Sequence, residues 1–549
     1  MTVYWLVWDA AAHWIVDRLD AEGELPHVRR LRSRGVRAAA RPPAPNCQTP
    51  PSLATLFTGV WPQEHGVTGF RVPSPTGPGD SVSGFARSAC LRPAVWETAG
   101  RAGLRTAAVH APWIADTVTA GGEPPAWLDG AIEAFSTRLA RHGTYEVGAA
   151  PLTFAVAHHT LTAAADAIGI RVRGAHDETY VEDDWTALTL GDGVGIWLRQ
   201  ARAGGRRLLL HTGAWVPRTV GHDPVLLAEL GAAPLFAGEG LGSCYRSGMF
   251  GPRLIDGGDG GDGGDGTAEE LFLSSVDRVG RGFEATVARV LAHHRSDLVV
   301  MYLPSTDDVG HELLGWCDAR SDAHRPDVAP EVWRHIARCY RRADAVLGRV
   351  LDRAGPGDTV VLGADHGMAG TAWTLHPDQL LLDAGLAVSD GAGRVDPARS
   401  AAYYHPVNNG SVWINGRAGY GGSASPDEIH DLARRVGELF APVRAPGTGR
   451  PLVHEVRPSP DGRVVDLLLD ADCLPSASLD RAGRPVSPAA KPGAHITNAG
   501  DDRLHAVFAA AGPGLARGED LGVIDNTWPA ELVLEHLTAS LPDRTARRV

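Results

Sequence analysis

The sequence predicts an α/β fold with a mostly parallel central sheet and two insertions. Short apolar runs rich in β-branched and aromatic residues alternate with amphipathic helical segments over roughly the first 115 residues, and again from about residue 275. The alternation weakens in the two intervening stretches. A chain of 549 residues is also too long for one ordinary core, so we expect either two domains or one large core with insertions.

The first part of the core begins with "TVYWLVW", residues 2–8, a nearly continuous apolar run typical of a strand buried on both faces. A basic amphipathic helix in residues 25–34 stops at Gly35 and leads into a strand. After a proline-rich turn, an apolar helix is expected to end at Thr58-Gly59. Residues 94–110 read as a further helix and strand, which completes a pattern of repeated α/β units.

Regular alternation returns in the second part of the core. The expected order of elements is helix, strand, helix, strand and a final buried strand, at residues 276–294, 296–304, 331–355, 358–368 and 503–514. The region between these last two strands is mixed, with a short strand in "GSVWING" and one helix in "PDEIHDLARRVGELF". We therefore predict one discontinuous core.

The predicted domain organisation follows from this alternation. The five segments are core 1–115 with the proline-rich turn, insertion 116–274, core 275–380, a small α+β insertion 381–489, and core completion 490–549. The first insertion, a candidate cap, contains the Gly/Asp-rich run 255–266. That run cannot bury apolar surface, so it predicts a surface loop, and its period of three does not match the nine-residue calcium-binding repeat.

Composition excludes several classes of function. The formal net charge is -13, which disfavours a nucleic-acid polymer or an anionic membrane as partner. The six scattered cysteines, without a CxxC pair, are expected to be buried thiols of a reduced compartment. The N-terminal stretch lacks a basic region before Asp9, and no apolar run reaches the roughly 20 residues that span a bilayer. We expect a cytoplasmic protein without a membrane partner.

Three predicted strands end in polar residues, and these residues are the first indication of chemistry. Asp9 follows the first strand, Asp307 and His311 follow another in "STDDVGHE", and Asp365 and His366 follow a third in "GADHGM". The carboxyl ends of strands in an open α/β sheet form the ligand crevice, so these side chains are expected to converge. Carboxylate oxygens and imidazole nitrogens are ligands that zinc or manganese accepts. Taken singly, each residue could instead belong to a turn or a helix cap.

A hydroxyl is presented rigidly in the stretch "NCQTPPSLATLFTG", where two prolines follow Thr49 directly. A threonine hydroxyl is a weak nucleophile at neutral pH, and coordination to a metal is one way to activate it. A pair of divalent ions roughly 3.5–4 Å apart is the usual device for in-line phosphoryl displacement. Read alone, Thr49 would be an ordinary turn hydroxyl ahead of Pro50.

Together these motifs resemble the alkaline phosphatase superfamily, and within it the type I phosphodiesterase/nucleotide pyrophosphatase group and its bacterial phosphohydrolase relatives. The match rests on Thr49 with Pro51 and Gly59, on "PQEHGV", on "DDVGH" and on "DHGM". A sulfatase would have a modifiable Cys or Ser at the position of Thr49. The resemblance implies an alkaline-phosphatase-like three-layer core.

The resemblance also implies the ligand sets. One zinc-type ion would be held by Asp307, His311 and His495, the other by Asp9, Asp365 and His366 with Thr49 touching it. His505 competes with His495, but its apolar neighbours favour a core histidine. Ser52 stands where the group often has an Asn that holds a phosphoryl oxygen, and Ala10 replaces a usual Gly after Asp9. We expect Ser52 to bind substrate.

The expected function is that of a two-metal hydrolase that cleaves phosphodiester or phosphoanhydride bonds of a small-molecule phosphate ester through a phosphothreonine on Thr49. A phosphomonoesterase, a phosphonate hydrolase and a phosphomutase are alternatives within the superfamily. A catalytically silent metal- or phosphate-binding protein is the alternative of another class, and six retained ligand candidates argue against it. An apolar shelf for a base or acyl group could come from Trp61, Phe70, Tyr245 and Phe250. The oligomeric state stays open.

Overall fold

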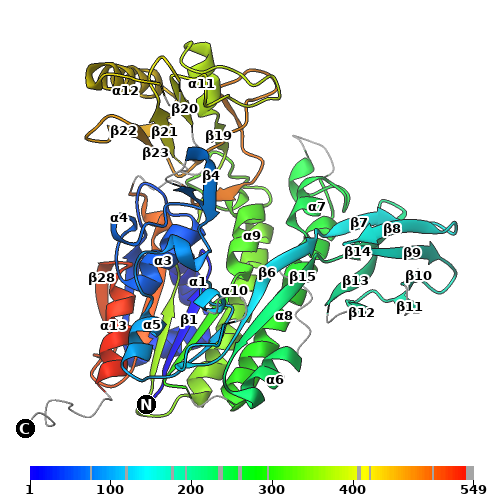
Figure 1. Cartoon of the computed structure of the whole chain (residues 1–549). Helices are drawn as coiled ribbons and strands as arrows, with labels where there is room; N and C mark the ends of the chain where they lie inside the picture. Colours follow the sequence, from blue (N-terminus) through cyan, green and yellow to red (C-terminus); the bar gives the residue numbers. More distant parts are fainter. Residues whose placement is uncertain are drawn as a thin grey trace, which may run out of the picture.

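The computed structural model describes residues 1–74, 77–117, 122–174, 178–191, 194–232, 239–257, 263–293, 296–404, 410–419, 422–496 and 500–539. A nine-stranded sheet forms its centre (Figure 1). In spatial order the strands are β15 (Ala214–Gly221), β6 (Leu128–Ala140), β5 (Thr106–Val109), β16 (Leu298–Leu303), β1 (Val3–Trp8), β17 (Thr359–Gly363), β27 (Ala506–Ala511), β2 (Val36–Arg41) and β28 (Glu519–Asp525). β15 and β27 run antiparallel to their neighbours, and the other pairings are parallel.

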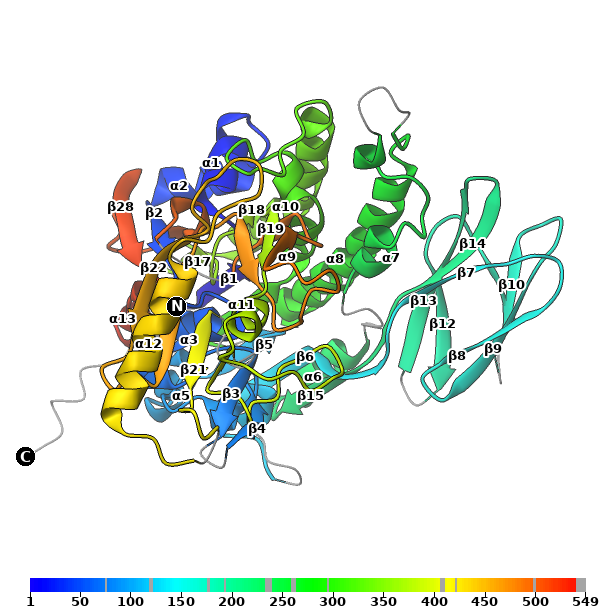
Figure 2. The ribbon, with the colours of Figure 1, turned by 90° about the horizontal axis from the view of Figure 1, so that it is seen from above.

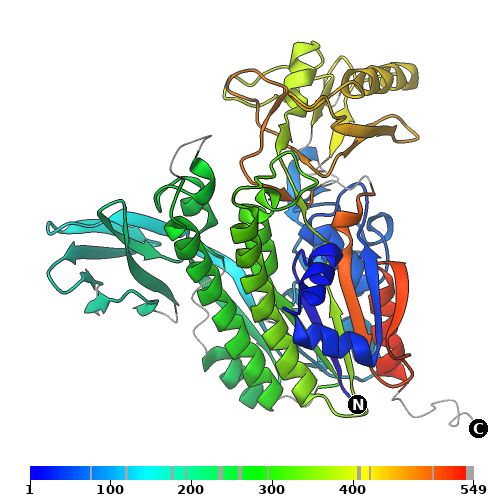
Figure 3. The same ribbon diagram turned by 180° about the vertical axis from the view of Figure 1, so that it is seen from behind.

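Helices cover both faces of this sheet, as the view from above shows (Figure 2). One layer contains α1 (His13–Ala21), α2 (Pro26–Arg34), α8 (Thr267–His293) and α10 (Ala329–Arg353). The other contains α3 (Thr49–Thr58), α5 (Val95–Arg101) and α13 (Trp528–Thr538). From behind, α8 and α10 are seen to run side by side along the sheet (Figure 3). The predicted three-layer α/β fold with a mostly parallel sheet is confirmed.

Strand β1 shows why the layers form. All six of its residues are buried, as expected for a central strand covered on both faces. Side chains three positions apart on a strand point to opposite faces. Trp5 accordingly meets Phe57 of α3 edge to face at 5.2 Å, whereas Trp8 meets Tyr340 of α10 at 6.4 Å. The tryptophans of "VYWLVW" therefore anchor a helix on each side of the sheet.

The region 116–274 differs from a simple insertion, because its ends form β6 and β15 of the main sheet. Between them the chain builds two four-stranded sheets with a common apolar core, and this β-sandwich projects to the side of the molecule in Figure 1. Its strands are β7 (Gly143–Glu146), β8 (Leu152–Val156), β9 (His159–Ala165), β10 (Ile170–Arg173), β11 (Glu178–Val181), β12 (Thr186–Gly191), β13 (Val194–Ala203) and β14 (Arg206–His211). The sequence reading missed the two main-sheet strands, since pairing partners far apart in the chain leave no local signal. Helices α6 (Pro224–Ala232) and α7 (Gly242–Arg246) follow, and residues 258–262 of the Gly/Asp-rich run lie outside the described residues.

A second module with its own apolar core lies above the main sheet in Figure 1. Its elements are α11 (Pro377–Asp383), α12 (Pro426–Phe440), β20 (Ala402–Tyr404), β21 (Ser411–Ile414), β22 (Val453–Pro458) and β23 (Val464–Leu469). A small sheet of β19 (Trp373–Leu375), β24 (Cys473–Pro475) and β25 (Val486–Pro488) leads into it. The remaining elements are α4 (Pro62–His65), α9 (Ser305–Leu313), β3 (Arg71–Ser74), β4 (Gly77–Ser83), β18 (Ala369–Gly370) and β26 (Gly493–Ala494). As a division of the chain into domains, the five predicted segments stay a prediction.

Two expectations concern properties of the whole chain. All six cysteines are buried and free, which confirms the prediction of buried thiols. Among the described residues, no helix combines the length and apolarity needed to cross a membrane.

Candidate active site

The polar residues after the three central strands converge. β1 lies between β16 and β17 and is parallel to both, so the carboxyl ends of the three strands lie at the same end of the sheet. The residues that follow these strands therefore meet there: Asp9, the residues at the start of α9, and Asp365 with His366. Six side chains form two groups, Asp307 with His311 and His495, and Asp9 with Asp365 and His366, whose ligand atoms lie within 4.8 Å of one another in each group.

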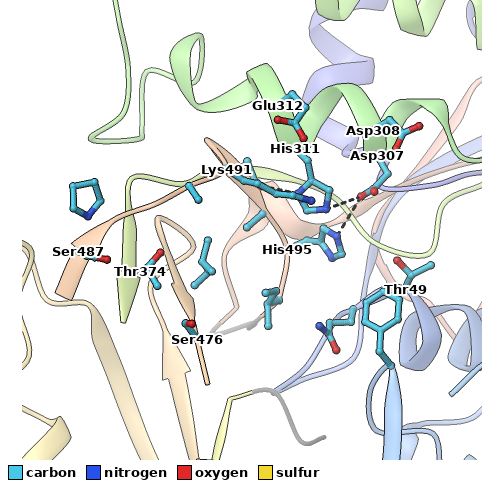
Figure 4. Close-up of a pocket in the computed structure, with 18 of the residues that line it drawn as sticks. Thr49, Asp307, Asp308, His311, Glu312, Thr374, Ser476, Ser487, Lys491 and His495 are labelled. Carbon is cyan, nitrogen blue, oxygen red and sulfur yellow. Dashed lines mark hydrogen bonds and ion pairs between the residues drawn. The ribbon is translucent and has the colours of Figure 1, made fainter. Parts of the chain in front are cut away.

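The first cluster is built on α9 and on the segment after β26. Asp307 and His311 are one helical turn apart, so they share a face of α9, and His311 Nε2 lies 3.4 Å from Asp307 Oδ1. His495 Nε2 approaches the same oxygen to 3.2 Å. Figure 4 shows these three side chains pointing toward one another.

The second cluster is fully buried and lies beside the first. His366 Nε2 is 3.0 Å from Asp365 Oδ2 and 3.6 Å from Asp9 Oδ1. Asp365 is fixed through its other oxygen, which accepts a hydrogen bond of 3.1 Å from the Ala10 N–H. The rings of His366 and His495 stack with centroids 3.8 Å apart, so the two clusters are adjacent.

Each histidine is oriented by a backbone carbonyl. His311 Nδ1 donates to Gly493 O at 2.7 Å, His366 Nδ1 to Gly367 O at 2.9 Å, and His495 Nδ1 faces Cys47 O at 3.4 Å. A proton on Nδ1 leaves the lone pair of Nε2 free, and Nε2 is the atom that faces the carboxylates in all three cases. This arrangement is how proteins fix the tautomer of a metal-binding histidine.

Three carboxylate oxygens of the clusters lack a hydrogen-bond donor in the described structure, and a bound cation would satisfy them. Asp9 Oδ1, Asp307 Oδ1 and Asp365 Oδ2 are buried, and none accepts a hydrogen bond from the described residues. Unpaired buried carboxylate oxygens are costly. Ligand atoms about 2.0–2.2 Å from a tetrahedral zinc ion would lie roughly 3.3–3.6 Å from one another, close to the separations seen here. Both clusters therefore fit divalent metal ions.

The electrostatics of the clusters point the same way. Burial, reinforced by the carboxylates of Asp365 and Asp307, raises the pKa of Asp9 well above its ordinary value. Burial would also raise the pKa of Asp307, but His311 and His495 outweigh it and lower that pKa. Burial lowers the pKa of His311 to about 3, so this imidazole is neutral at pH 7. A bound cation would stabilise the charged form of Asp9 and would meet a neutral imidazole lone pair, so the site is suited to a cation.

Thr49 begins helix α3 and faces the second cluster. Its Oγ1 lies 3.5 Å from His366 Nε2. Pro50 and Pro51 occupy the next two helical positions and have no N–H, while the Ser52 N–H donates to Gln48 O at 3.1 Å. The helix ends at Gly59, whose φ of 72° is left-handed, so the predicted end of α3 is confirmed.

The turn before Thr49 is tied to the segment that carries His495. The Cys47 N–H donates to Ile496 O at 3.1 Å, and Cys47 Sγ contacts His495 O at 2.7 Å. Asn46 Oδ1 accepts from the Gln48 N–H at 2.9 Å, which closes the turn on its other side. Thr49 and His495 of the neighbouring cluster are thus held in fixed relation, although they are 446 positions apart in the sequence.

Ser52 lies one helical turn after Thr49 and is fully buried. Its Oγ has no hydrogen-bond partner among the described residues. It does not line either of the two cavities that Thr49 lines in the described structure. Its role in holding a phosphoryl oxygen stays a prediction.

Two cavities meet at Thr49, Phe70 and Asp307. The lysine-side cavity has a volume of 670 Å³ and is lined by Thr374, His376, Ser476, Ser487 and Lys491, besides residues of the first cluster. The aromatic-side cavity has a volume of 530 Å³ and is lined by Phe85, His110, Trp215 and Tyr302, besides Asp9. A substrate centred at Thr49 could therefore extend in two directions.

Sequence reasoning missed several residues that position the site. The hydroxyl of Tyr302 donates to Asp9 Oδ2, and that of Thr306 donates to Asp9 O at 2.5 Å. Asn526 Nδ2 donates to Asp365 O at 2.7 Å and so fixes the turn after β17. Tyr302 and Thr306 flank the end of a predicted strand, and that position was an available signal. Asn526 lies far along the chain and gave no signal.

Two other expectations can be placed. His505 lies outside both clusters, at the start of β27, and its backbone oxygen accepts from the His13 N–H at 2.9 Å. Of the four residues of the expected apolar shelf, Phe70 lines both cavities. Tyr245 and Phe250 are buried in the main core, so their place on the shelf was wrong.

Comparison with known proteins assigns the chain to a family. The sequence profile of type I phosphodiesterase/nucleotide pyrophosphatase matches residues 6–503. The chain belongs to this family, which is part of the alkaline phosphatase superfamily. The predicted resemblance is confirmed, and the protein is a hydrolase of the phosphodiesterase class.

Solved structures of the family are distant in sequence. Murine ectonucleotide pyrophosphatase/phosphodiesterase 5 is 14% identical with a TM-score of 0.49, and its human counterpart is 12% identical with a TM-score of 0.49. An inactive variant of the murine protein in complex with AMP is 13% identical with a TM-score of 0.47. Each match covers 99% of this chain and 96% of the other. No curated protein matches the chain.

Proposed function

We propose that this member of the family hydrolyses a phosphodiester or phosphoanhydride bond of a small-molecule phosphate ester through a phosphothreonine on Thr49. The observation that carries the proposal is the position of Thr49 Oγ1 at the start of α3, 3.5 Å from His366 Nε2 of the second cluster and on the wall of both cavities. A phosphoryl group at this point would meet the hydroxyl, both clusters and the positive end of the helix together.

The metal sites of the proposal are assigned to this chain's own residues. Asp307, His311 and His495 would hold one ion, and Asp9, Asp365 and His366 the other. The mixed nitrogen and oxygen donors favour zinc, with manganese as the second choice. When bound, two such ions would neutralise charge on the phosphoryl oxygens and lower the pKa of a nearby hydroxyl.

In the proposed reaction the protein acts through Thr49. The Oγ1 proton passes to water as Oγ1 forms a bond to phosphorus, and the bond from phosphorus to the leaving oxygen breaks with its electron pair on that oxygen. Water then cleaves the phosphothreonine and regenerates the hydroxyl. The Thr49 N–H is the donor that the first turn of α3 offers to a phosphoryl oxygen, because the next two residues are prolines and the Ser52 N–H already donates to Gln48 O.

Substitution of Thr49 tests the covalent step. We expect Thr49→Ala to lower turnover of a chromogenic phosphodiester by at least about a thousandfold, because the nucleophile is removed. Thr49→Ser keeps the oxygen and should retain measurable activity. Zinc content, measured by atomic emission, should stay at the wild-type value in both variants, since the six candidate ligands remain.

Near wild-type turnover by Thr49→Ala would exclude the phosphothreonine and favour direct attack by water. Metal-free wild-type protein that still cleaves the ester would contradict the proposed role of the two clusters.

We extend the proposal to the cellular location of the protein. A reduced, cytoplasmic location is supported by six buried thiols that form no disulfide.

A further inference from the structure

Lys491 is the only lysine in a chain that contains 52 lysine and arginine residues in total. It lies between β25 and β26 and lines the lysine-side cavity. The side chain is half-buried, and no hydrogen bond or ion pair joins its ammonium group to another residue of the described chain. A half-buried cation without a direct partner, facing the cavity of an active site, is expected to meet a ligand.

The charged groups around Lys491 already have other roles. The charges that act on it most strongly are those of Asp307, Arg246, Asp308 and Glu239. Asp307 belongs to the first metal cluster, and Asp308 accepts a hydrogen bond of 3.4 Å from the Gly240 N–H.

The remaining two charges are also engaged. Glu239 lies 3.4 Å from His142 and 3.5 Å from Arg138, and Arg246 pairs with Glu312. The positive charge of Lys491 is thus left for the cavity when a cation occupies the neighbouring cluster.

The position of Lys491 relative to Thr49 indicates which part of the substrate Lys491 would face. In Figure 4, His311 and His495 lie between Lys491 and Thr49. The attacking and leaving oxygens of phosphoryl transfer are roughly in line, on opposite sides of phosphorus. A phosphoryl group attacked by Thr49 and held between the clusters would therefore send its leaving group toward the lysine-side cavity.

Part of the wall of this cavity is polar, beside apolar residues such as Leu474 and Ile496. The hydroxyl groups come from Thr374 in β19, Ser476 directly after β24 and Ser487 in β25 (Figure 4). His376 Nε2 lies 2.9 Å from Ser487 Oγ, and its Nδ1 lies 2.7 Å from Ser478 O, so the ring orients this hydroxyl. Hydroxyl groups beside an ammonium group suit an oxygen-rich anion better than an apolar group.

We propose that Lys491 selects substrates whose leaving group carries its own negative charge, and that the phosphate-terminated leaving group of a phosphoanhydride is the class that fits. The inference rests on the proposed function and decides between its phosphodiester and phosphoanhydride forms. When the bond to phosphorus breaks, its electron pair goes to the leaving oxygen, which adds charge to a group that is already anionic. The Lys491 ammonium group donates hydrogen bonds to that group.

Kinetics with esters that share one transferred group test the proposal. Thymidine 5′-triphosphate and the 4-nitrophenyl ester of thymidine 5′-monophosphate transfer the same thymidylyl group, but only the first has a leaving group with further negative charge. We expect Lys491→Met to lower kcat/KM for the triphosphate about ten- to a hundredfold and to leave the nitrophenyl ester within about threefold. Lys491→Arg should recover part of the loss, because it restores the charge with a different shape.

A matched control and a third ester sharpen the result. Arg173→Met removes one positive charge from an exposed pair with Glu178 in the β-sandwich, away from both cavities, and should change both esters alike. A 4-carboxyphenyl ester separates the two sources of anionic charge, since a loss as large as that for the triphosphate would show that a carboxylate is selected equally well and would overturn the assignment to phosphate.

Because Lys491 is the only lysine, its binding can be observed without turnover. Reductive methylation with carbon-13 formaldehyde labels this side chain and the N-terminus alone, and keeps the charge. In the Thr49→Ala protein, we expect the Lys491 methyl resonance to shift on addition of thymidine 5′-triphosphate and to stay in place with the nitrophenyl ester. This readout also serves if Lys491→Met fails to fold.

The failures of the two proposals are distinguishable. Equal losses for both esters in Lys491→Met, with an unmoved methyl resonance, would overturn the role of Lys491 and leave the hydrolase intact. A zinc-loaded wild-type protein that cleaves none of the three esters would overturn the proposed function itself.

Discussion

At the scale of single residues, the site depends on which nitrogen of each histidine is free. The three histidines of the candidate metal clusters offer Nε2 because their Nδ1 atoms face the carbonyls of Gly493, Gly367 and Cys47. His505, ten positions after His495, lies outside both clusters. The distinction is therefore made by the backbone around each ring and not by the residue type.

His495 and His505 provide a direct test of this distinction. We expect His495→Ala to lower the zinc content by about one ion per chain, because a three-residue site loses one ligand and its affinity with it. His505→Ala serves as the control and should keep the wild-type content. Both contents can be measured by atomic emission after gel filtration. A loss of zinc in His505→Ala alone would exchange the two assignments.

At the scale of elements, helix α3 presents Thr49, the proposed nucleophile, and a buried histidine holds this helix in place. His65 of the "PQEHGV" motif is fully buried. Its Nε2 lies 3.1 Å from Thr55 Oγ1 in α3, and its Nδ1 accepts from the Val67 N–H at 3.1 Å. Burial lowers the pKa of His65 to about 4, so the ring is neutral where the helix is stable. The motif is thus a structural support of the nucleophile helix.

The neutral state of His65 predicts a dependence of stability on pH. Unfolded histidine binds its proton near pH 6.5, and the folded one near pH 4, so the folded form is penalised as the pH falls through this window. We expect wild-type protein to be more stable than His65→Gln at pH 7 and to lose up to about 3 kcal/mol of that advantage by pH 4. The difference can be measured by urea unfolding at several pH values.

A constant difference between wild type and His65→Gln would mean that the pKa of His65 is the same in the folded and the unfolded protein.

At the scale of the whole molecule, parts far apart in sequence close around the two clusters. The segments that follow β1, β16 and β17 provide five of the six candidate metal ligands, and the segment after β26 provides the sixth. The small sheet that leads into the second module provides part of the wall of the lysine-side cavity. Asp9, Asp307 and Asp365 bring three carboxylates together in the buried interior, and each keeps an oxygen without a donor. Bound cations should therefore stabilise the folded state as well as the reaction.

Removal of metal should reveal this contribution. We expect a chelator to lower the melting temperature by on the order of 5 °C, because ligand at a thousand times its Kd stabilises a protein by about 4 kcal/mol. Added zinc should restore the original value. His366→Ala lacks one ligand and should show a smaller decrease on chelation. An unchanged melting temperature in wild-type protein would mean that the clusters are stable without ions.

The sequence by itself determined the parts of the fold that have a local pattern. The apolar runs of β1, β16 and β17 and the polar residues directly after them were readable because strand burial and strand ends leave periodic signals. The end of α3 at Gly59 was readable because glycine readily takes the left-handed conformation that ends a helix. The six ligand candidates and Thr49 came from motif spacing, and the parallel order of three strands is what brings them together.

Only the tertiary structure decided what depends on contacts between distant segments. The pairing of β6 and β15 with the main sheet and the β-sandwich between them are non-local, so 116–274 gave no regular pattern. The same holds for the hydrogen bond from Tyr302 to Asp9. Lys491 was visible in the sequence as a residue but not as a site, because its meaning comes from the cavity that α9 and the small sheet of β25 form around it.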